Sequence, residues 1–161
     1  MAKLKRPMPP AEQVEGINAW FSPAPDLAAW AVGSFIANGE QLRNPDHEHL
    51  QNAHIGFLWT NVQNARKDRL VIGTAEPGAP QGAMGKWSRA HAVLQVTEWF
   101  GMVPQFIVTI DATCWLRASD AEACALVEHE LYHCAQDRDD VLPHVTLLLL
   151  ASLQMLPAHP V

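Results

Sequence analysis

The sequence predicts one folded domain built from a mixture of helices and strands. Three apolar runs have the length and composition of strands, at residues 54–60, 69–77 and 105–111. Two longer stretches, 88–101 and 120–136, have the apolar spacing and the termini of helices. The length of 161 residues corresponds to about one domain, and a hydrophobic content of 48% can build a core without disulfides.

The first 25 residues differ from the rest of the chain because prolines recur at positions 7, 9, 10, 23 and 25. This pattern predicts a Pro-rich N-terminal lead-in over residues 1–25 and a single domain over residues 26–161. Lys3, Lys5 and Arg6 are interpreted as part of a solvated tail. Prolines follow them where a signal peptide would have its apolar segment.

The bulk composition narrows the class of protein. The net charge of −6 argues against broad binding to phosphate backbones, so no nucleic acid partner is expected. The longest apolar run, 145–156, is too short to span a bilayer, so no membrane association is expected. The three cysteines are odd in number and form no C-x-x-C pair, which favours reduced thiols and a cytoplasmic location.

The elements before the last helix are expected in the following order. Asp26 caps a helix over 27–38 that Gly39 closes, and Asn44-Pro45-Asp46 opens a helical turn. A buried strand over 54–60, a second strand over 69–77, a flexible loop over 77–85, a helix over 88–101 ending at Gly101 and a strand over 105–111 follow.

The helix over 120–136 has the clearest start signal in the chain. Ser119 and Glu122 have the S-x-x-E spacing of a capping box, in which each side chain accepts a hydrogen bond from a free backbone N–H group. The polar run 137–140 is expected to end this helix. The apolar tail 141–156 is expected to be helical after Pro143.

This helix contains the motif H-E-x-x-H, formed by His129, Glu130 and His133. Two histidines four residues apart lie on the same helix face, where their imidazole nitrogens can converge on one Zn²⁺ ion. Glu130 can then act as general base toward a water held on the metal, which is the chemistry of a zinc peptidase.

The runs FIVTID, Trp115 and ALVEHELYHC resemble the phage metallopeptidase family, small zincins related in layout to the minimal gluzincins and the SprT-like proteases. The resemblance covers roughly residues 44–140. It implies an α+β, zincin-like fold, with a small antiparallel or mixed sheet packed on helices and an HExxH active-site helix. It also implies a phage or prophage source, His129 and His133 as metal ligands and Glu130 as the catalytic base.

A catalytic zinc site needs a third protein ligand, and the chain leaves several choices. His144 is the first choice, because it follows the polar run and begins the second candidate helix. Asp139 is the second choice, and Asp140 and Asp137 are weaker ones. The resemblance implies a second helix that carries a His with acidic residues, where an acidic third ligand would be natural. In this chain no Asp or Glu follows Asp140.

Two other groups of residues are given no part in the metal site. The cluster over 46–49, which contains His47 and His49, is expected to be a solvated turn because neighbouring side chains in a short helix splay apart. Tyr132 lies between the two ligands and is expected to face away from the metal. We assign it no role in the chemistry.

The leading interpretation is a zinc-dependent metallopeptidase of the host cytoplasm that acts on a protein or peptide substrate. The first alternative is a structural or interaction protein that binds zinc without turnover, because the tail lacks the acidic ligand. The second alternative is a protease of DNA-bound proteins, which the acidic charge disfavours. The oligomeric state is left open.

Overall fold

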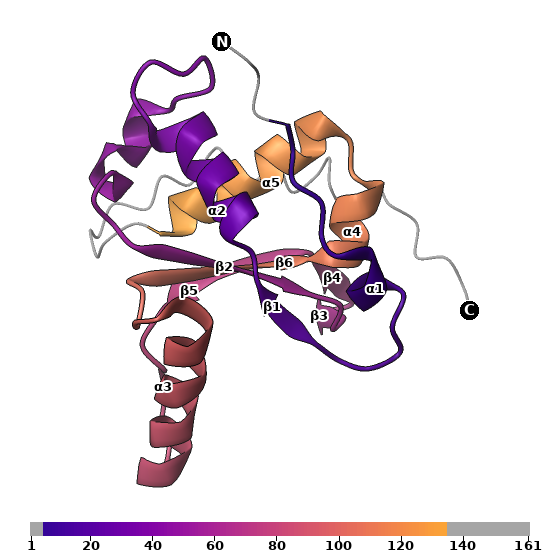
Figure 1. Cartoon of the computed structure of the whole chain (residues 1–161), viewed down its shortest axis with the longest axis vertical. Helices are drawn as coiled ribbons and strands as arrows, with labels where there is room; N and C mark the ends of the chain where they lie inside the picture. Colours follow the sequence, from indigo (N-terminus) through magenta and orange to yellow (C-terminus); the bar gives the residue numbers. More distant parts are fainter. Residues whose placement is uncertain (1–4, 135–161) are drawn as a thin grey trace.

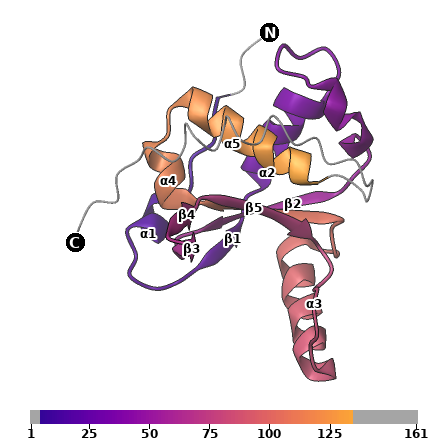
Figure 2. The same ribbon diagram turned by 180° about the vertical axis from the view of Figure 1, so that it is seen from behind.

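The computed structural model describes residues 5–134 and contains a small mixed sheet with helices on both of its faces (Figures 1 and 2). The helices α2 (Pro25–Ala31) and α5 (Asp120–His133) cover one face, and α3 (Lys86–Phe100) projects from the other face. This arrangement confirms the expected α+β architecture with a small mixed sheet. In the described part of the chain, no helix is both long and apolar enough to cross a membrane.

The sheet has the strand order β1-β2-β6-β5. Its centre is the parallel pair β2 (Ile55–Thr60) and β6 (Phe106–Asp111), which correspond to the predicted strands 54–60 and 105–111. The strands β1 (Phe21–Pro23) and β5 (Gly73–Pro77) pair antiparallel on either side. All six residues of β2 are buried, as expected for a central strand that is covered on both faces.

The larger core lies between the sheet and the helices α2 (Pro25–Ala31), α4 (Ala112–Arg117) and α5 (Asp120–His133). Trp115 is fully buried at its centre and contacts Trp30 and Trp59 edge-on, at ring-centroid distances of 5.8 and 5.3 Å. Such aromatic pairs contribute beyond the apolar area that they bury.

Several element boundaries differ from the sequence-based expectation. Ala24, and not Asp26, is the N-cap of α2, and Pro25 takes the first helical position, where its missing N–H costs nothing. The helix continues as a π-helical turn over Val32–Ile36. The expected strand 69–77 is interrupted at Ile72: β4 (Arg69–Val71) forms a separate hairpin with β3 (Asn64–Arg66), and β5 follows. The short helix α4 was not predicted.

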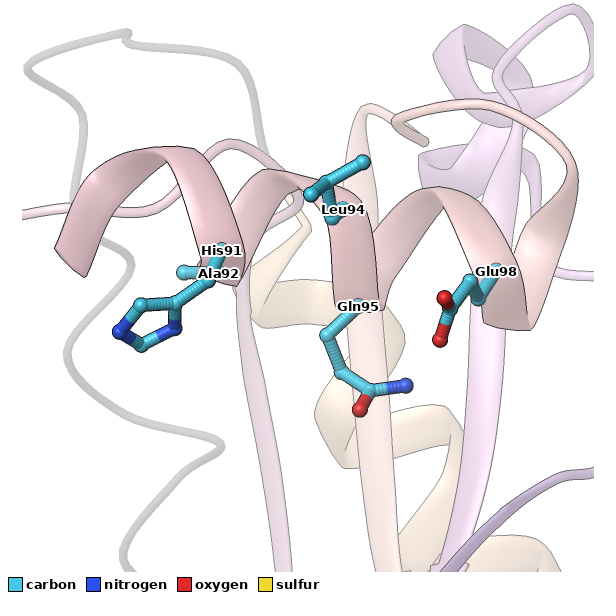
Figure 3. A pocket seen from close by; sticks show the side chains of 5 residues that line it. All are labelled: His91, Ala92, Leu94, Gln95 and Glu98. Atoms are coloured by element: carbon cyan, nitrogen blue, oxygen red, sulfur yellow. The ribbon is translucent and has the colours of Figure 1, made fainter. Parts of the chain in front are cut away.

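The helix α3 (Lys86–Phe100) is confirmed and ends at Gly101, whose φ of 73° is readily accessible to glycine. Its last turn packs on the sheet through a second cluster that contains Leu58, Val96 and Ile107. Its first half projects away from the sheet, and the Trp87 side chain is 87% exposed. A shallow depression along α3 is lined by His91, Ala92, Leu94, Gln95 and Glu98 (Figure 3).

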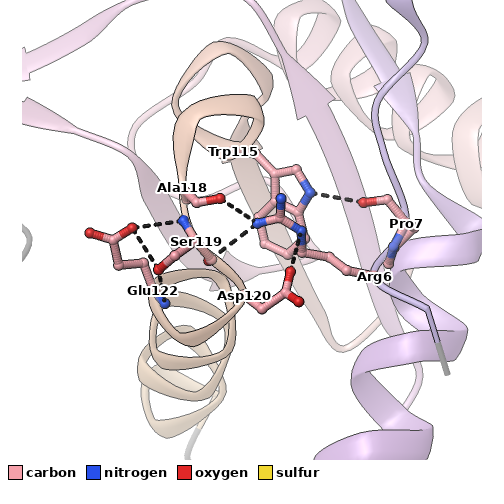
Figure 4. Close-up of polar contacts among 7 residues, drawn as sticks. All are labelled: Arg6, Pro7, Trp115, Ala118, Ser119, Asp120 and Glu122. Carbon is pink, nitrogen blue, oxygen red and sulfur yellow. Dashed lines mark hydrogen bonds and ion pairs between the residues drawn. The ribbon is translucent and has the colours of Figure 1, made fainter. Parts of the chain in front are cut away.

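The N-terminal segment contacts the start of α5 (Figure 4). The guanidinium of Arg6 donates to the carbonyl oxygen of Ala118 at 2.8 Å and lies 3.3 Å from the Asp120 carboxylate. The indole N–H of Trp115 donates to the carbonyl oxygen of Pro7 at 2.8 Å. The expectation of a solvated tail is therefore wrong for Arg6. The domain boundary at residue 25 stays a prediction.

Candidate metal centre

The helix α5 carries the HExxH motif, and its start is formed as the sequence predicts. The Ser119 side chain accepts from the Glu122 backbone N–H at 3.3 Å, and the Glu122 carboxylate accepts from the Ser119 N–H at 2.7 Å. Its inner face is buried through Ala123, Leu126, Val127, Glu130 and Leu131. The capping box and this apolar face hold the helix against the sheet.

The two motif histidines converge. Their Nε2 atoms lie 3.1 Å apart, with ring centroids 4.7 Å apart and ring planes at 83°. Two imidazole nitrogens bound to one tetrahedral zinc at about 2.0–2.1 Å would be separated by about 3.3 Å. The pair therefore fits two ligand positions of a single metal ion.

The electrostatics of His129 favour its neutral form. Burial lowers the pKa of His129, and the neighbouring His133 ring lowers it further because two imidazolium charges would repel. Only the neutral imidazole can donate a lone pair to a metal. The surroundings thus keep His129 in the form that a metal site requires.

Glu130 is a carboxyl group in a poorly solvated position. Its side chain lies in the interior with 4% of the residue exposed, and burial raises its pKa to about 7. A group with a pKa near neutrality can both accept and return a proton at physiological pH. Glu130 directly follows His129 in the sequence and precedes His133 by three residues.

Glu130 fits beneath β5 because position 73 has no side chain. A Cβ atom on Gly73 would lie 2.9 Å from the Glu130 Oε1 atom and 3.0 Å from Leu126 Cδ1. Such distances are shorter than normal van der Waals contact, so any larger residue would displace the carboxyl group. Gly73 therefore allows α5 and the first residue of β5 to approach each other closely.

The strand β5 lies at the edge of the sheet, and its outer side is unpaired among residues 5–134. The Asp111 N–H donates to the Ile72 carbonyl, and the Gly78 N–H donates to the Gln105 carbonyl. Hydrogen-bonded pairs alternate in an antiparallel ladder, so Thr74 and Glu76 also bond toward β6. The backbone groups of Gly73 and Ala75 consequently point to the open edge, next to Glu130.

The expected third ligands cannot be placed. His144, Asp139, Asp140 and Asp137 lie outside the described residues. Among residues 5–134, no group of three or more His, Cys, Asp or Glu side chains is arranged to hold a metal ion. His129 and His133 come together, Glu130 lies on the buried face of the same helix, and His144 as a ligand stays a prediction.

The cluster over 46–49 is the expected solvated turn at Asp46, Glu48 and His49, which are exposed, but not at His47. It lies in the 3₁₀ helix η2 (Pro45–Leu50), which packs against α5, and His47 is fully buried. The His47 ring contacts the Tyr132 ring edge-on at 4.6 Å, and burial lowers the pKa of His47. Tyr132 bonds to Asn44 and Asp46 of this segment. The helix-start signal at Asn44 was visible in the sequence, but its partner on α5 was not.

The depression along α3 is not part of this centre. It lies on the helix that projects from the opposite face of the sheet to α5 (Figures 2 and 3). The candidate site instead lies on the C-terminal half of α5, which faces the edge strand β5 at Gly73. These two elements contact each other directly.

Fold and site together define an α+β protein in which a helix with two convergent imidazoles and a buried carboxyl group lies beside an open sheet edge. The family model described as "Putative phage metallopeptidase" matches residues 28–147, and the chain belongs to this family. Membership implies a metal-dependent hydrolase that acts on proteins. No curated protein and no solved structure matches the chain.

The buried position of Glu130 predicts how the stability of the metal-free protein depends on pH. Between pH 4.5 and about 7, the folded state retains a proton that the unfolded state has released, so stability falls as the pH rises through this window. The variant Glu130→Gln has no such proton. It should be more stable than the wild type at pH 8, by about 1–3 kcal/mol, and should lose this advantage at pH 4.

Urea unfolding of chelator-treated protein at the two pH values measures this difference. The matched control is Glu98→Gln, which changes an exposed carboxylate on α3 and should leave the pH dependence unaltered. An equal stability difference between Glu130→Gln and wild type at both pH values would contradict the burial of an ionisable Glu130.

Proposed function

We propose that this protein is a zinc-dependent metallopeptidase whose centre contains His129, His133 and Glu130. The observation that carries the proposal is the 3.1 Å separation of the two Nε2 atoms on a helix in which Glu130, the residue after His129, is a buried carboxyl group. Family membership supports a metal and a protein substrate. The choice of zinc rests on the imidazole ligands and on the HExxH spacing.

Each residue has a distinct task in this proposal. His129 and His133 would hold the ion, which would supply an acidified water molecule and polarise the scissile carbonyl group. Glu130 would accept the proton of the attacking water, which is the role of the glutamate in an HExxH motif. Glu130 then returns the proton to the departing amine. Its position beneath β5 keeps bulk water away from the carboxyl group.

The backbone of β5 can align the substrate. Gly73 and Ala75 direct N–H and C=O groups to the open edge, so an extended peptide can pair there as an additional strand. Pro77 has no N–H group and ends the pairing. A bound peptide would therefore lie beside Glu130 over only a few residues.

His144 is proposed as the third ligand from the segment that follows α5. The only histidines downstream of the motif are His144 and His159, and no acidic residue follows Asp140. The ten residues between His133 and His144 are enough to end one helix and reverse the chain.

The ligand assignment predicts the effect of three alanine variants on zinc content. His129→Ala should lose stoichiometric zinc, and His144→Ala should weaken zinc binding strongly, because each removes one of three protein ligands. Asp139→Ala should have little effect. Elemental analysis of the purified proteins measures the content, and zinc retained in full by His129→Ala would exclude the site.

The proposed base predicts that Glu130→Gln retains zinc but loses peptide hydrolysis. Glutamine has the same shape and cannot accept the proton, so the rate should fall by about 10²–10⁴. Cleavage of casein and of a fluorogenic peptide library, with zinc content measured in parallel, tests this. Wild-type protein that holds zinc but cleaves neither substrate class would favour a zinc protein without turnover.

The role of β5 predicts opposite effects for two proline variants. Ala75→Pro removes an outward N–H without breaking a bond to β6, so KM for peptides should rise about 3–10-fold at unchanged stability. Thr74→Pro removes an inward N–H and should destabilise the fold instead. Steady-state kinetics and thermal unfolding separate the two outcomes. An unchanged KM for Ala75→Pro would exclude pairing at this edge.

A further inference from the structure

The segment 44–49 contacts α5 on the side away from its buried face. The Asn44 side-chain amide donates to Glu128 Oε1 at 2.8 Å and to the Tyr132 hydroxyl oxygen at 2.7 Å. The Tyr132 hydroxyl in turn donates to Asp46 Oδ2 at 3.0 Å. One short segment is thus bonded to two successive turns of the helix that carries the motif.

Glu128 and Tyr132 each precede a motif histidine by one residue. Because they are four residues apart, they lie on one stripe of α5, and His129 and His133 lie on the adjacent stripe about 100° around the axis. A bridge between Glu128 and Tyr132 therefore restrains the rotation of the same two turns that present the imidazoles. A small rotation of either turn would change the distance between the two Nε2 atoms.

The contacts from segment 44–49 matter most for His133, which lies in the last turn of α5. The final carbonyl groups of a helix lack partners within the helix, so the last turn is its least stable part. The segment contacts the residues on both sides of His133. It holds Tyr132 through its hydroxyl and ring, and His49 Nε2 lies 3.4 Å from the Cys134 carbonyl oxygen.

Asn44 has two separable functions. Its Oδ1 atom accepts from the Asp46 N–H at 3.0 Å and caps η2, whereas its Nδ2 atom donates to α5. Aspartate at this position would preserve the cap, since Asp and Asn cap helices equally well. It would replace the donor by a carboxylate that faces the carboxylate of Glu128.

We propose that Asn44 is a positioning residue for the metal centre, which sets the orientation of His129 and His133 by bridging Glu128 and Tyr132. This inference rests on the proposed zinc site. Asn44 touches neither metal nor substrate, so its effect reaches the centre through the rotation of the last two turns of α5. Groups that orient metal ligands typically change metal affinity by about 10–100-fold.

The test compares Asn44→Asp, Glu128→Gln and the double variant. Asn44→Asp should weaken zinc binding about tenfold, because like charges replace the hydrogen bond to Glu128. Glu128→Gln should stay within about twofold of wild type, since its amide oxygen still accepts from Asn44. In the double variant the new amide at position 128 can donate to the new carboxylate at position 44, and affinity should return to within about threefold of wild type.

Zinc dissociation constants come from competition with a chromophoric chelator, and the melting temperature of the metal-free proteins is measured in parallel. The visible absorption of the cobalt-substituted proteins reports the ligand geometry, which a general loss of stability would not change. Wild-type affinity in Asn44→Asp would overturn the proposal. So would a double variant that remains as weak as Asn44→Asp.

The variant His129→Ala separates failure of this inference from failure of the zinc site. If His129→Ala loses zinc and Asn44→Asp keeps wild-type affinity, the site stands and the role of Asn44 is wrong. If His129→Ala binds zinc as tightly as wild type, the site itself is wrong, and the inference fails with it. Tyr132→Phe should weaken zinc binding less than Asn44→Asp, because its ring contact with His47 remains.

Discussion

The close approach of α5 to β5 at Gly73 is the contact on which the candidate site depends. It places Glu130 between the helix and the first residue of the edge strand, where a side chain at position 73 would collide with it. The same contact removes the carboxyl group from water and raises its pKa to about 7. A buried carboxyl group beside the sheet edge is therefore a consequence of backbone packing. No charged partner is among the causes of the shift.

Burying a carboxyl group costs free energy, so α5 must be held in place by other contacts. Its inner face supplies apolar burial through Val127 and Leu131, which are fully buried in the main core. Its start is held by the capping box and by Arg6, which joins the N-terminal segment to Asp120. Its last turns are held by the segment that begins at Asn44. The polar motif thus lies between two restraints that are far apart in the sequence.

In the proposed centre, these restraints would make residues outside the motif matter to the site. A helix that packed only through its apolar face could still rotate by a few degrees, and the separation of its imidazoles would change with it. Hydrogen bonds from Asn44 to Glu128 and Tyr132 oppose that rotation because they are directional. Tyr132, which projects away from the imidazoles, has a clear function in this arrangement as an anchor for η2.

The sequence by itself determined the two central strands, α5 with its capping box, and the pairing of His129 with His133, because each depends on neighbours within a few residues. It did not determine α4, the break between β4 and β5, or the burial of His47. Those features depend on contacts between segments far apart in the chain, such as Asp111 N–H with the Ile72 carbonyl. In the sequence, Gly73 could be recognised only as one residue of the predicted strand 69–77. Gly73 matters because tertiary packing brings the Glu130 side chain beneath it. A local sequence pattern cannot predict which strand a helix will pack against.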